Sequence, residues 1–259
     1  MTEIVALLHT IAPLLRKTTL GQLCQVVFEV LAASGRITML GLSRWTEKGG
    51  SYRTIQRLYH TLLPWNAIHW QFFRQRFLQP EGECFIDGDE GVVSKAGKET
   101  YGLDRFFSGL QQQVIILKTN LVTHAQAHAI LFSTDLAQAY DHIIRLYSLR
   151  FQIEFHFRDA KQYWGLEDFM IDKATAITNA ANLAFFMVNV SQALLKPFRQ
   201  HQPDYSILDL KSHYRGYRYA RETIKLLPQK PDAHLLAHIF AQIARLGAIH
   251  SLSQHSPTP

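Results

Sequence analysis

The sequence predicts an α-rich α/β protein, with a helical N-terminal part, a short strand-forming segment and a return to helices. Through residues 2–80, apolar residues recur at three- and four-residue spacing, as in EIVALLHTIAPLL and LGQLCQVVFEVLAASG, the latter closed by Gly35. This is the period of amphipathic helices. After Pro80 and Gly82, β-prone runs alternate with glycine, which predicts strands and turns. The helical period returns at Gln138 and continues to the C-terminal region.

The composition is that of an ordinary globular protein. Of 259 residues, 47% are hydrophobic and 19% are charged, and the formal net charge of +6 favours polyanionic partners such as nucleic acid. Cys24 and Cys84 lack ligand spacing and are expected to be reduced core residues. No signal peptide is expected. Polar residues interrupt the apolar stretch Ala180–Leu195, which predicts a buried helix and no membrane partner.

Residues 37–63 resemble a helix-turn-helix. ITMLGLSRW is followed by the polar break TEKGG and by SYRTIQRLYHTLL, for which Ser51 is a suitable N-cap. Arg53, Arg57 and His60 share one face of the second predicted helix, and Lys48 lies in the loop before it. Such a face could enter a major groove or contact phosphates. The alternative is a solvated face on an ordinary helical hairpin.

The strand-forming segment contains several β-prone runs. ECFIDGDEGVVSKAGKETYGLDRFFSG reads as a strand, a turn and a second strand, and VIILKTNL and AHAILFSTDL read as two more. VIILKTNL is almost continuously apolar, which suits a central strand buried on both faces.

The segment YDHIIRLYSLRFQIEFHFRDAKQYWG reads as one helix. At about 100° per residue, Tyr147, Arg150, Glu154 and Lys161 share one polar stripe. That stripe borders an apolar one made of Leu146, Leu149, Ile153, Phe157, Ala160 and Trp164. A carboxylate in this position is partly dehydrated yet reachable, as suits a metal ligand supported by cations. The alternative is an unremarkable helix on which Arg150 and Glu154 form an i, i+4 pair.

The pattern Tyr-x2-Arg-x3-Glu-x6-Lys, formed by these four polar residues, resembles the signature of DDE transposases encoded by bacterial insertion sequences. Upstream, FIDGDEGVVSKAGKETYGLDRFF resembles the segment that carries the family's first catalytic aspartate. Asp89 has the expected lysine, Lys95, six residues later, whereas Asp87 is the competing choice because it lies nearer the strand FID. The resemblance covers nearly all of residues 40–250.

The resemblance implies an RNase H-like core, in which two aspartates and one glutamate hold two divalent metals, Mg²⁺ or Mn²⁺. Asp89 and Glu154 are the implied metal ligands, and Tyr147, Arg150 and Lys161 complete the implied catalytic set. The implied partner is double-stranded DNA at the terminal repeats of an element, with a homodimer or an association with a full-length transposase as further possibilities. A bacterial cytoplasmic location, at the nucleoid when DNA is bound, is also implied.

The second catalytic aspartate of the family has no evident counterpart. Only 65 positions separate Asp89 from Glu154, and the chain passes directly from RFFSGLQQQ to VIILKTNL. The remaining candidates, Asp104 and Asp135, lie in the first hairpin and at the end of a later strand. We therefore expect an incomplete RNase H-like domain at 81–200, between a helical DNA-binding-like domain at 1–80 and a basic helical extension at 201–259, with impaired DNA cleavage.

The tract KSHYRGYRYARETIK interleaves basic and aromatic residues. Its members are Lys211, Tyr214, Arg215, Tyr217, Arg218, Tyr219, Arg221 and Lys225. Such a tract suits phosphate contact and base stacking, and Arg215, Arg218 and Arg221 are the predicted DNA contacts together with Lys95. In the alternative, the tyrosines pack and the arginines pair with Asp209 or Glu222.

Three functions are compatible with these patterns. The first is a DDE transposase, whole or disabled. The second is a non-catalytic DNA-binding remnant that recognises element ends or regulates a full-length transposase. The third is a stand-alone helix-turn-helix regulator, a function that does not explain the pattern from Tyr147 to Lys161.

Overall fold

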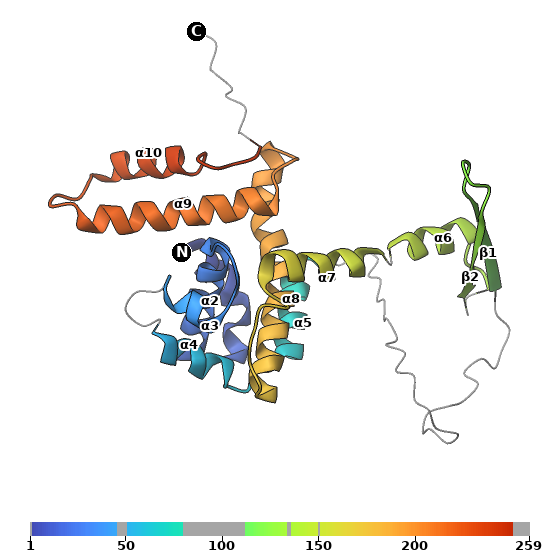
Figure 1. Ribbon diagram of the computed structural model, residues 1–259, viewed down its shortest axis with the longest axis horizontal. Coiled ribbons are helices and arrows are strands. Elements are labelled where there is room, and N and C mark those ends of the chain that lie inside the picture. Colours follow the sequence, from blue (N-terminus) through green and yellow to red (C-terminus); the bar gives the residue numbers. More distant parts are fainter. Residues whose placement is uncertain (1, 46–50, 80–111, 134–135, 150, 251–259) are drawn as a thin grey trace, which may run out of the picture. The chain divides into compact units, whose positions relative to one another are not determined.

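A computed structural model describes residues 2–45, 51–79, 112–133, 136–149 and 151–250 of the chain. The described chain is mostly helical, with little strand. It divides into two compact units, one made of Met1–Pro80 with His156–Pro259 and the other of Glu81–Phe155. Figure 1 shows the elements of both units.

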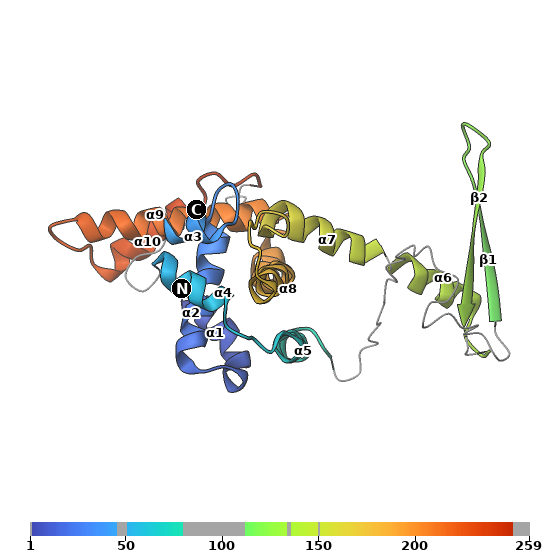
Figure 2. The ribbon, with the colours of Figure 1, turned by 60° about the horizontal axis from the view of Figure 1, so that its bottom comes forward.

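The first unit is a helical bundle drawn from both ends of the chain. Its N-terminal elements are α1 (Thr2–Leu8), the 3-10 helix η1 (His9–Leu14), α2 (Lys17–Ala32), α3 (Met39–Ser43), α4 (Tyr52–Tyr59) and α5 (Trp65–Arg76). Its later elements are α8 (Ala174–His201), α9 (Ile207–Leu226) and α10 (Ala233–Ile243). The predicted helical character of residues 2–80 is confirmed in the described ranges, and α10 lies along α9 (Figure 2).

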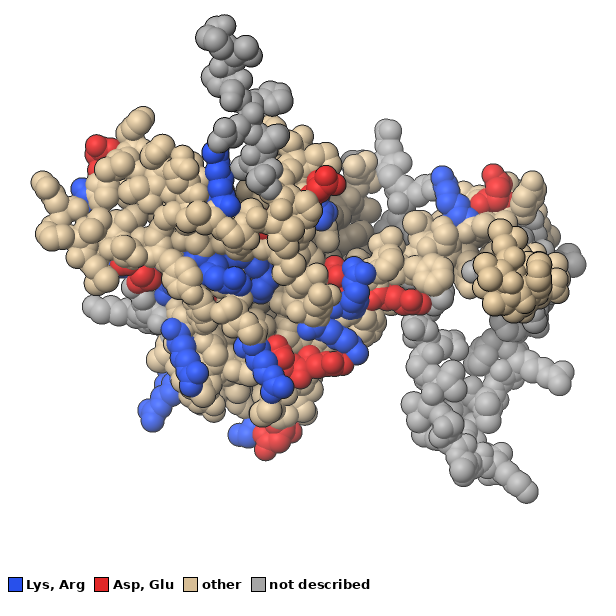
Figure 3. Space-filling view, turned by 45° about the horizontal axis from the view of Figure 1, so that its top comes forward, with Lys and Arg blue, Asp and Glu red and all other residues tan. Residues whose placement is uncertain are grey.

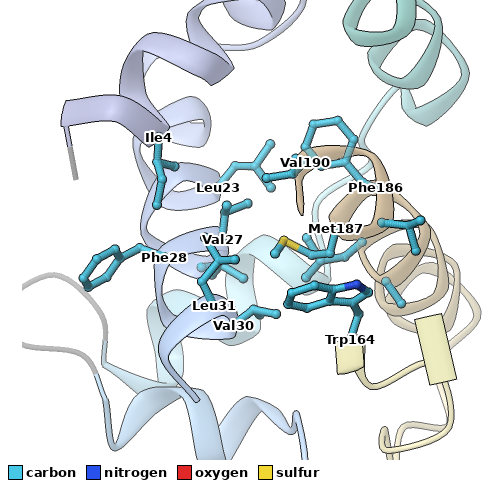
Figure 4. Close-up of a cluster of buried hydrophobic side chains, with 14 of the residues drawn as sticks. Ile4, Leu23, Val27, Phe28, Val30, Leu31, Trp164, Phe186, Met187 and Val190 are labelled. Atoms are coloured by element: carbon cyan, nitrogen blue, oxygen red, sulfur yellow. The ribbon is translucent and has the colours of Figure 1, made fainter. Parts of the chain in front are cut away.

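Helix α2 is the centre of this bundle. Every residue from Val26 to Ala32 is buried, because α2 packs against α1, α4 and α9. Figure 4 shows Leu23, Val27 and Val30 facing Met187 and Val190 of α8. A helix that is hydrophobic around its whole circumference is stable only when other helices surround it. The predicted core position of Cys24 is confirmed, and burial raises the pKa of its thiol. Cys84 lies outside the described residues.

Helix α8 contains the predicted buried stretch. Its buried side chains include Leu183, Phe186, Met187 and Leu195, which confirms a core helix. Within the described ranges, no helix is both long and apolar enough to cross a lipid bilayer.

A buried asparagine of α8 joins α4 to α5. Asn179 is 4% exposed, and its Nδ2 donates to the carbonyl oxygens of Tyr59 and Thr61 at 2.6 and 2.7 Å. Its Oδ1 accepts a 2.7 Å hydrogen bond from Trp65 Nε1. The last carbonyls of a helix have no partner within it. The side-chain amide of Asn179 therefore supplies hydrogen-bond donors to carbonyl groups at the end of α4. The same amide group holds Trp65, the first residue of α5.

The start of α9 anchors the end of the described chain. Ser206 and Asp209 form a capping box, and the fully buried Asp209 also accepts hydrogen bonds from Ile249 N and from His250 N and Nδ1. Burial alone would raise the pKa of Asp209, but the hydrogen bonds from His250 and Ser206 outweigh it and hold the pKa well below its ordinary value.

The compact units do not follow the three predicted domain ranges. The predicted boundary at residue 80 coincides with a unit boundary, but residues 1–80 and 201–259 belong to one unit. The reason is packing, because α9 lies against α2 and their side chains share one core. Of the predicted domain at 81–200, the part from His156 onward also belongs to this unit.

The second unit contains an antiparallel hairpin and a helix. β1 (Gln112–Thr119) pairs with β2 (Gln126–Ser133) in the register Ile115↔Ile130, and α6 (Tyr140–Leu149) follows. These two strands confirm the strands predicted for VIILKTNL and AHAILFSTDL. The prediction that the first is buried on both faces is wrong for Ile115 and Leu117, which are 61% and 76% exposed. Within the described chain, β1 pairs with β2 alone, and a strand is buried on both faces only when layers cover both. The strands predicted within residues 83–109 lie outside the described residues.

Replacing Asn179 with alanine is expected to destabilise the helical unit by about 2–4 kcal/mol, because it leaves the Trp65 Nε1 donor and the α4 carbonyls buried without this partner. Urea unfolding followed by circular dichroism measures the change. Asn66→Ala, at an exposed site of α5, is the matched control and should change the unfolding free energy by less than about 0.5 kcal/mol. Equal effects of the two substitutions would contradict the role given to Asn179.

Candidate functional site

The segment predicted to be the catalytic helix is helical on both sides of Arg150. α6 ends at Leu149 and α7 (Phe151–Trp164) begins two positions later, with Arg150 outside the described residues. Tyr147 therefore belongs to α6, whereas Glu154 and Lys161 belong to α7. Projection of all four residues onto one circumference requires an unbroken helix. Since Arg150 is not among the described residues, the single polar stripe of Tyr147, Arg150, Glu154 and Lys161 stays a prediction from the sequence.

Glu154 and Lys161 are both exposed on α7. The apolar stripe beside them is buried only at its end, at Ala160 and Trp164, while Phe157 is 46% exposed. The partly dehydrated setting expected for Glu154 is thus replaced by an exposed one. The Lys161 ammonium pairs at 2.6 Å with Glu167 in the segment after α7. Lys161 lies seven positions after Glu154 on α7, which is about 10 Å along the helix axis.

The other predicted catalytic positions lie outside the described residues. They are Asp87, Asp89, Lys95, Asp104 and Asp135. Among the residues whose positions are given, no group of three or more His, Cys, Asp and Glu side chains could hold a metal ion. The pairing of Asp89 with Glu154 around Mg²⁺ or Mn²⁺ stays a prediction from the sequence.

Helices α3 and α4 form the segment predicted to be a helix-turn-helix. They contact each other, and α4 buries Ile55, Leu58 and Tyr59 against the bundle. Arg53 and Arg57 remain exposed one helical turn apart. The N-cap of α4 is Ser51, as predicted, although its hydroxyl contacts Thr54 Oγ1 at 3.1 Å and forms no capping bond to the backbone. His60 is the half-buried C-cap, and Lys48 lies outside the described residues.

Arg53 and Arg57 are two exposed cations on α4 that a polyanion could contact. Because the buried face of α4 fixes the rotation of the helix, both guanidinium groups project from its solvent side. Figure 3 shows basic side chains at several places on the molecule, with acidic side chains beside some of them. The exposure of Arg53 and Arg57 is compatible with phosphate contact and also with the alternative of a solvated face.

Much of the basic tract is built into the protein interior. Lys211 is 8% exposed, and its ammonium donates to Val30 O at 3.0 Å and lies 4.8 Å from the centre of the Trp164 ring. Arg215 donates to Ala32 O at 3.2 Å and to Ala33 O at 3.3 Å. These oxygens lie at the C-terminal end of α2, where carbonyls lack helical partners and the helix dipole is negative. Lys211 and Arg215 therefore cap α2.

Arg218 is also an internal residue. It is 6% exposed, and its Nη1 lies 3.8 Å from Glu29 Oε1 and 3.3 Å from Glu222 Oε1. Its Nη2 donates to the carbonyl oxygen of Trp45. Glu29 is 1% exposed in the middle of α2, so Arg218 neutralises a carboxylate that has been taken out of water.

Some aromatic residues of the tract are packed in the interior, and others are exposed. Tyr214 is buried and donates to Glu3 Oε2 at 3.3 Å, and Tyr217 stacks on Phe240 with 4.6 Å between ring centres. Tyr219 is 57% exposed, and Arg221 is half-buried. Arg218 pairs with Glu222, as the alternative interpretation predicted, whereas Arg215 donates to backbone carbonyls and not to Asp209 or Glu222. A sequence signal for this arrangement was Glu29, a lone carboxylate in the apolar run VVFEVLA.

Comparison with known families concerns the first half of the chain. Residues 10–134 match the model of the family described as DDE superfamily endonuclease. The match covers a little less than half of the sequence and is consistent with a transposase-like protein. It includes α4 and Asp89, whereas the residues from Tyr147 to Lys161 lie beyond it. No match was found among curated proteins or among solved structures.

Lys211 is expected to make folding stability rise with pH. Burial, and secondarily Arg215, lower its pKa from 10.5 to about 8, against an opposing effect of Asp168. Between these values the unfolded chain retains the proton and the folded chain releases it, so the unfolding free energy increases with pH. Relative to Lys211→Met, the native protein should gain up to about 1.4 kcal/mol per pH unit above pH 8.

Chemical denaturation from pH 7.5 to 9.5 tests this expectation. The range stops there because burial raises the pKa of Tyr205 to about 12 and also raises that of Tyr214, so ionisation of these tyrosines in the unfolded chain removes stability at higher pH. Lys196→Met, at an exposed site of α8, is the control and should retain the native slope. An identical slope for native protein and Lys211→Met would show that Lys211 titrates normally.

Proposed function

We propose that the chain is a DNA transposase of the DDE type whose catalytic set is incomplete. The observation that carries the proposal is the match of residues 10–134 to DDE superfamily endonucleases, followed in the chain by the spacing of Tyr147, Arg150, Glu154 and Lys161. Four identities at three fixed spacings, placed after a matched endonuclease region, are difficult to obtain by chance.

The proposed chemistry is phosphodiester cleavage and strand transfer at the ends of an insertion sequence. Asp89 and Glu154 would hold a divalent cation, which supplies Lewis acidity and an activated oxygen nucleophile. Arg150 and Lys161 would balance the charge of the bound phosphate and carboxylates. Because no second aspartate occupies the family's position, the cluster has one hard ligand too few and cleavage is impaired.

A second function, non-catalytic binding to element ends, is favoured by the composition of the core. The main cluster of buried hydrophobic residues runs from Ile4 to Tyr214 and, in the described chain, includes no residue between 81 and 155. The helical unit that carries Arg53 and Arg57 thus has a hydrophobic core formed by its own described residues. It could bind DNA and compete with a complete transposase even without cleavage.

The cleavage proposal predicts little or no nicking of duplex DNA that carries the element's terminal repeats, in Mg²⁺ or in Mn²⁺. A supercoiled-plasmid nicking assay measures it. If the protein cleaves the DNA strongly and Asp89→Ala or Glu154→Ala abolishes this cleavage, the catalytic set is complete. The proposal that cleavage is impaired would then be wrong. Cleavage that survives both substitutions would remove these residues from the proposed site.

The DNA-binding proposal predicts that Arg53→Gln and Arg57→Gln each weaken binding to terminal-repeat duplexes. Each substitution should reduce the slope of log K against log salt by about 0.9, because each removes one phosphate contact. Fluorescence anisotropy at several salt concentrations measures both effects. Arg74→Gln, at an exposed site of α5 in the same unit, is the control. Unchanged affinity and slope in both α4 variants would leave α4 as a solvated surface.

A further inference from the structure

A cavity lies beside α2, and no residue of α4 or α7 lines it. It has a volume of about 720 Å³, within the range of small-molecule sites, and is lined by residues of α1, η1, α2 and α9. Its apolar wall includes Val5, Leu15, Leu20 and Cys24. All of these elements belong to the helical unit, so the cavity is formed within one compact body.

The charged residues of the cavity give it an excess of cations. Lys17, Arg218 and Arg221 line it together with one carboxylate, Glu29. Arg218 is engaged with Glu29 and Glu222. In the part of the chain with known positions, Lys17 and Arg221 form no ion pair, so their charges remain available to a ligand.

Gly21 leaves room in the same wall. It lies in the second turn of α2, and a Cβ atom built on it meets no other atom within 4 Å. Its surroundings and its backbone therefore do not demand glycine, although glycine is unfavourable inside a helix. A side chain at position 21 would project into open space at a wall that Gly21 shares with Leu20 and Cys24.

We propose that this cavity binds an amphipathic monoanion, namely a medium-chain carboxylate. The alkyl chain lies along the wall formed by Leu15, Leu20 and Cys24, and the carboxylate pairs with Arg221. An apolar wall with a few cations suits an apolar body with one anionic head. It suits the DNA backbone poorly, since phosphates require a wet, polar surface.

Isothermal titration of the full-length protein with decanoate, well below the concentration at which it forms micelles, tests the proposal. Saturable binding to one site is expected. 1-Decanol lacks the anionic head and acetate lacks the alkyl chain, so both should bind at least about tenfold more weakly. Bound decanoate should also slow alkylation of Cys24 by N-ethylmaleimide, which peptide mass spectrometry separates from alkylation of Cys84.

Matched variants locate the ligand. Arg221→Gln should weaken decanoate binding about tenfold, whereas Arg245→Gln, at an exposed site that does not line the cavity, should leave it unchanged. Gly21→Leu should fill the space and abolish binding, and Gly21→Ala should retain most of it. Circular dichroism and thermal melting establish that each variant is folded.

Three results would overturn the proposal. The first is binding that does not saturate, or that is indifferent to Arg221 and Gly21, because it would be partition onto the surface. The second is equal affinity for 1-decanol, because the cations would then have no part. The third is displacement of decanoate by duplex DNA, with the DNA protecting Cys24 from alkylation as well as decanoate does. This result would assign the cavity to a DNA-binding surface.

Discussion

The capping and neutralisation of α2 by α9 is the constraint on which the helical unit depends. α2 is buried along most of its length, and its last carbonyl groups have no helical partners. Lys211 and Arg215 supply donors to those carbonyls, and Arg218 neutralises Glu29. Without these three cations, α2 would bury unsatisfied polar groups at a cost of several kcal/mol. The first and last parts of the described chain are therefore one folding unit.

This constraint changes what the surplus of basic residues means. The net charge of +6 suggests a polyanion, but part of the positive charge serves internal helix ends and a buried carboxylate. The charge that remains available for DNA in the described chain lies elsewhere, for instance on α4, where Arg53 and Arg57 are exposed. Asn179 ties that helix to α5 through hydrogen bonds at 2.6–2.7 Å. For the DNA binding proposed for α4, a surface fixed to a rigid core in this way would lose little conformational entropy on association.

The elements proposed for catalysis have a different physical setting. Glu154 lies on an exposed part of α7, and the apolar side chains of β1 at Ile115 and Leu117 are exposed as well. A two-metal site needs several carboxylates held close together by a rigid framework, since they must fix two ions about 3.5–4 Å apart. The proposed catalytic set, with Asp89 and Glu154 as its two carboxylates, would lack part of that support, whereas the DNA binding proposed for the helical unit makes no such demand.

The local structure could be predicted from the sequence: the helices of residues 2–80, the strands at 112–133, the buried helix around residues 180–195 and the core position of Cys24. Each follows from a periodicity or an apolar run that neighbouring residues define. Long-range packing decided that Lys211 and Arg218 are internal and that α9 shares a core with α2. The contact of Lys211 with Val30 joins residues 181 positions apart. Periodicity shows which face of a helix is buried, but it cannot show which distant carbonyl or carboxylate will meet a cation there.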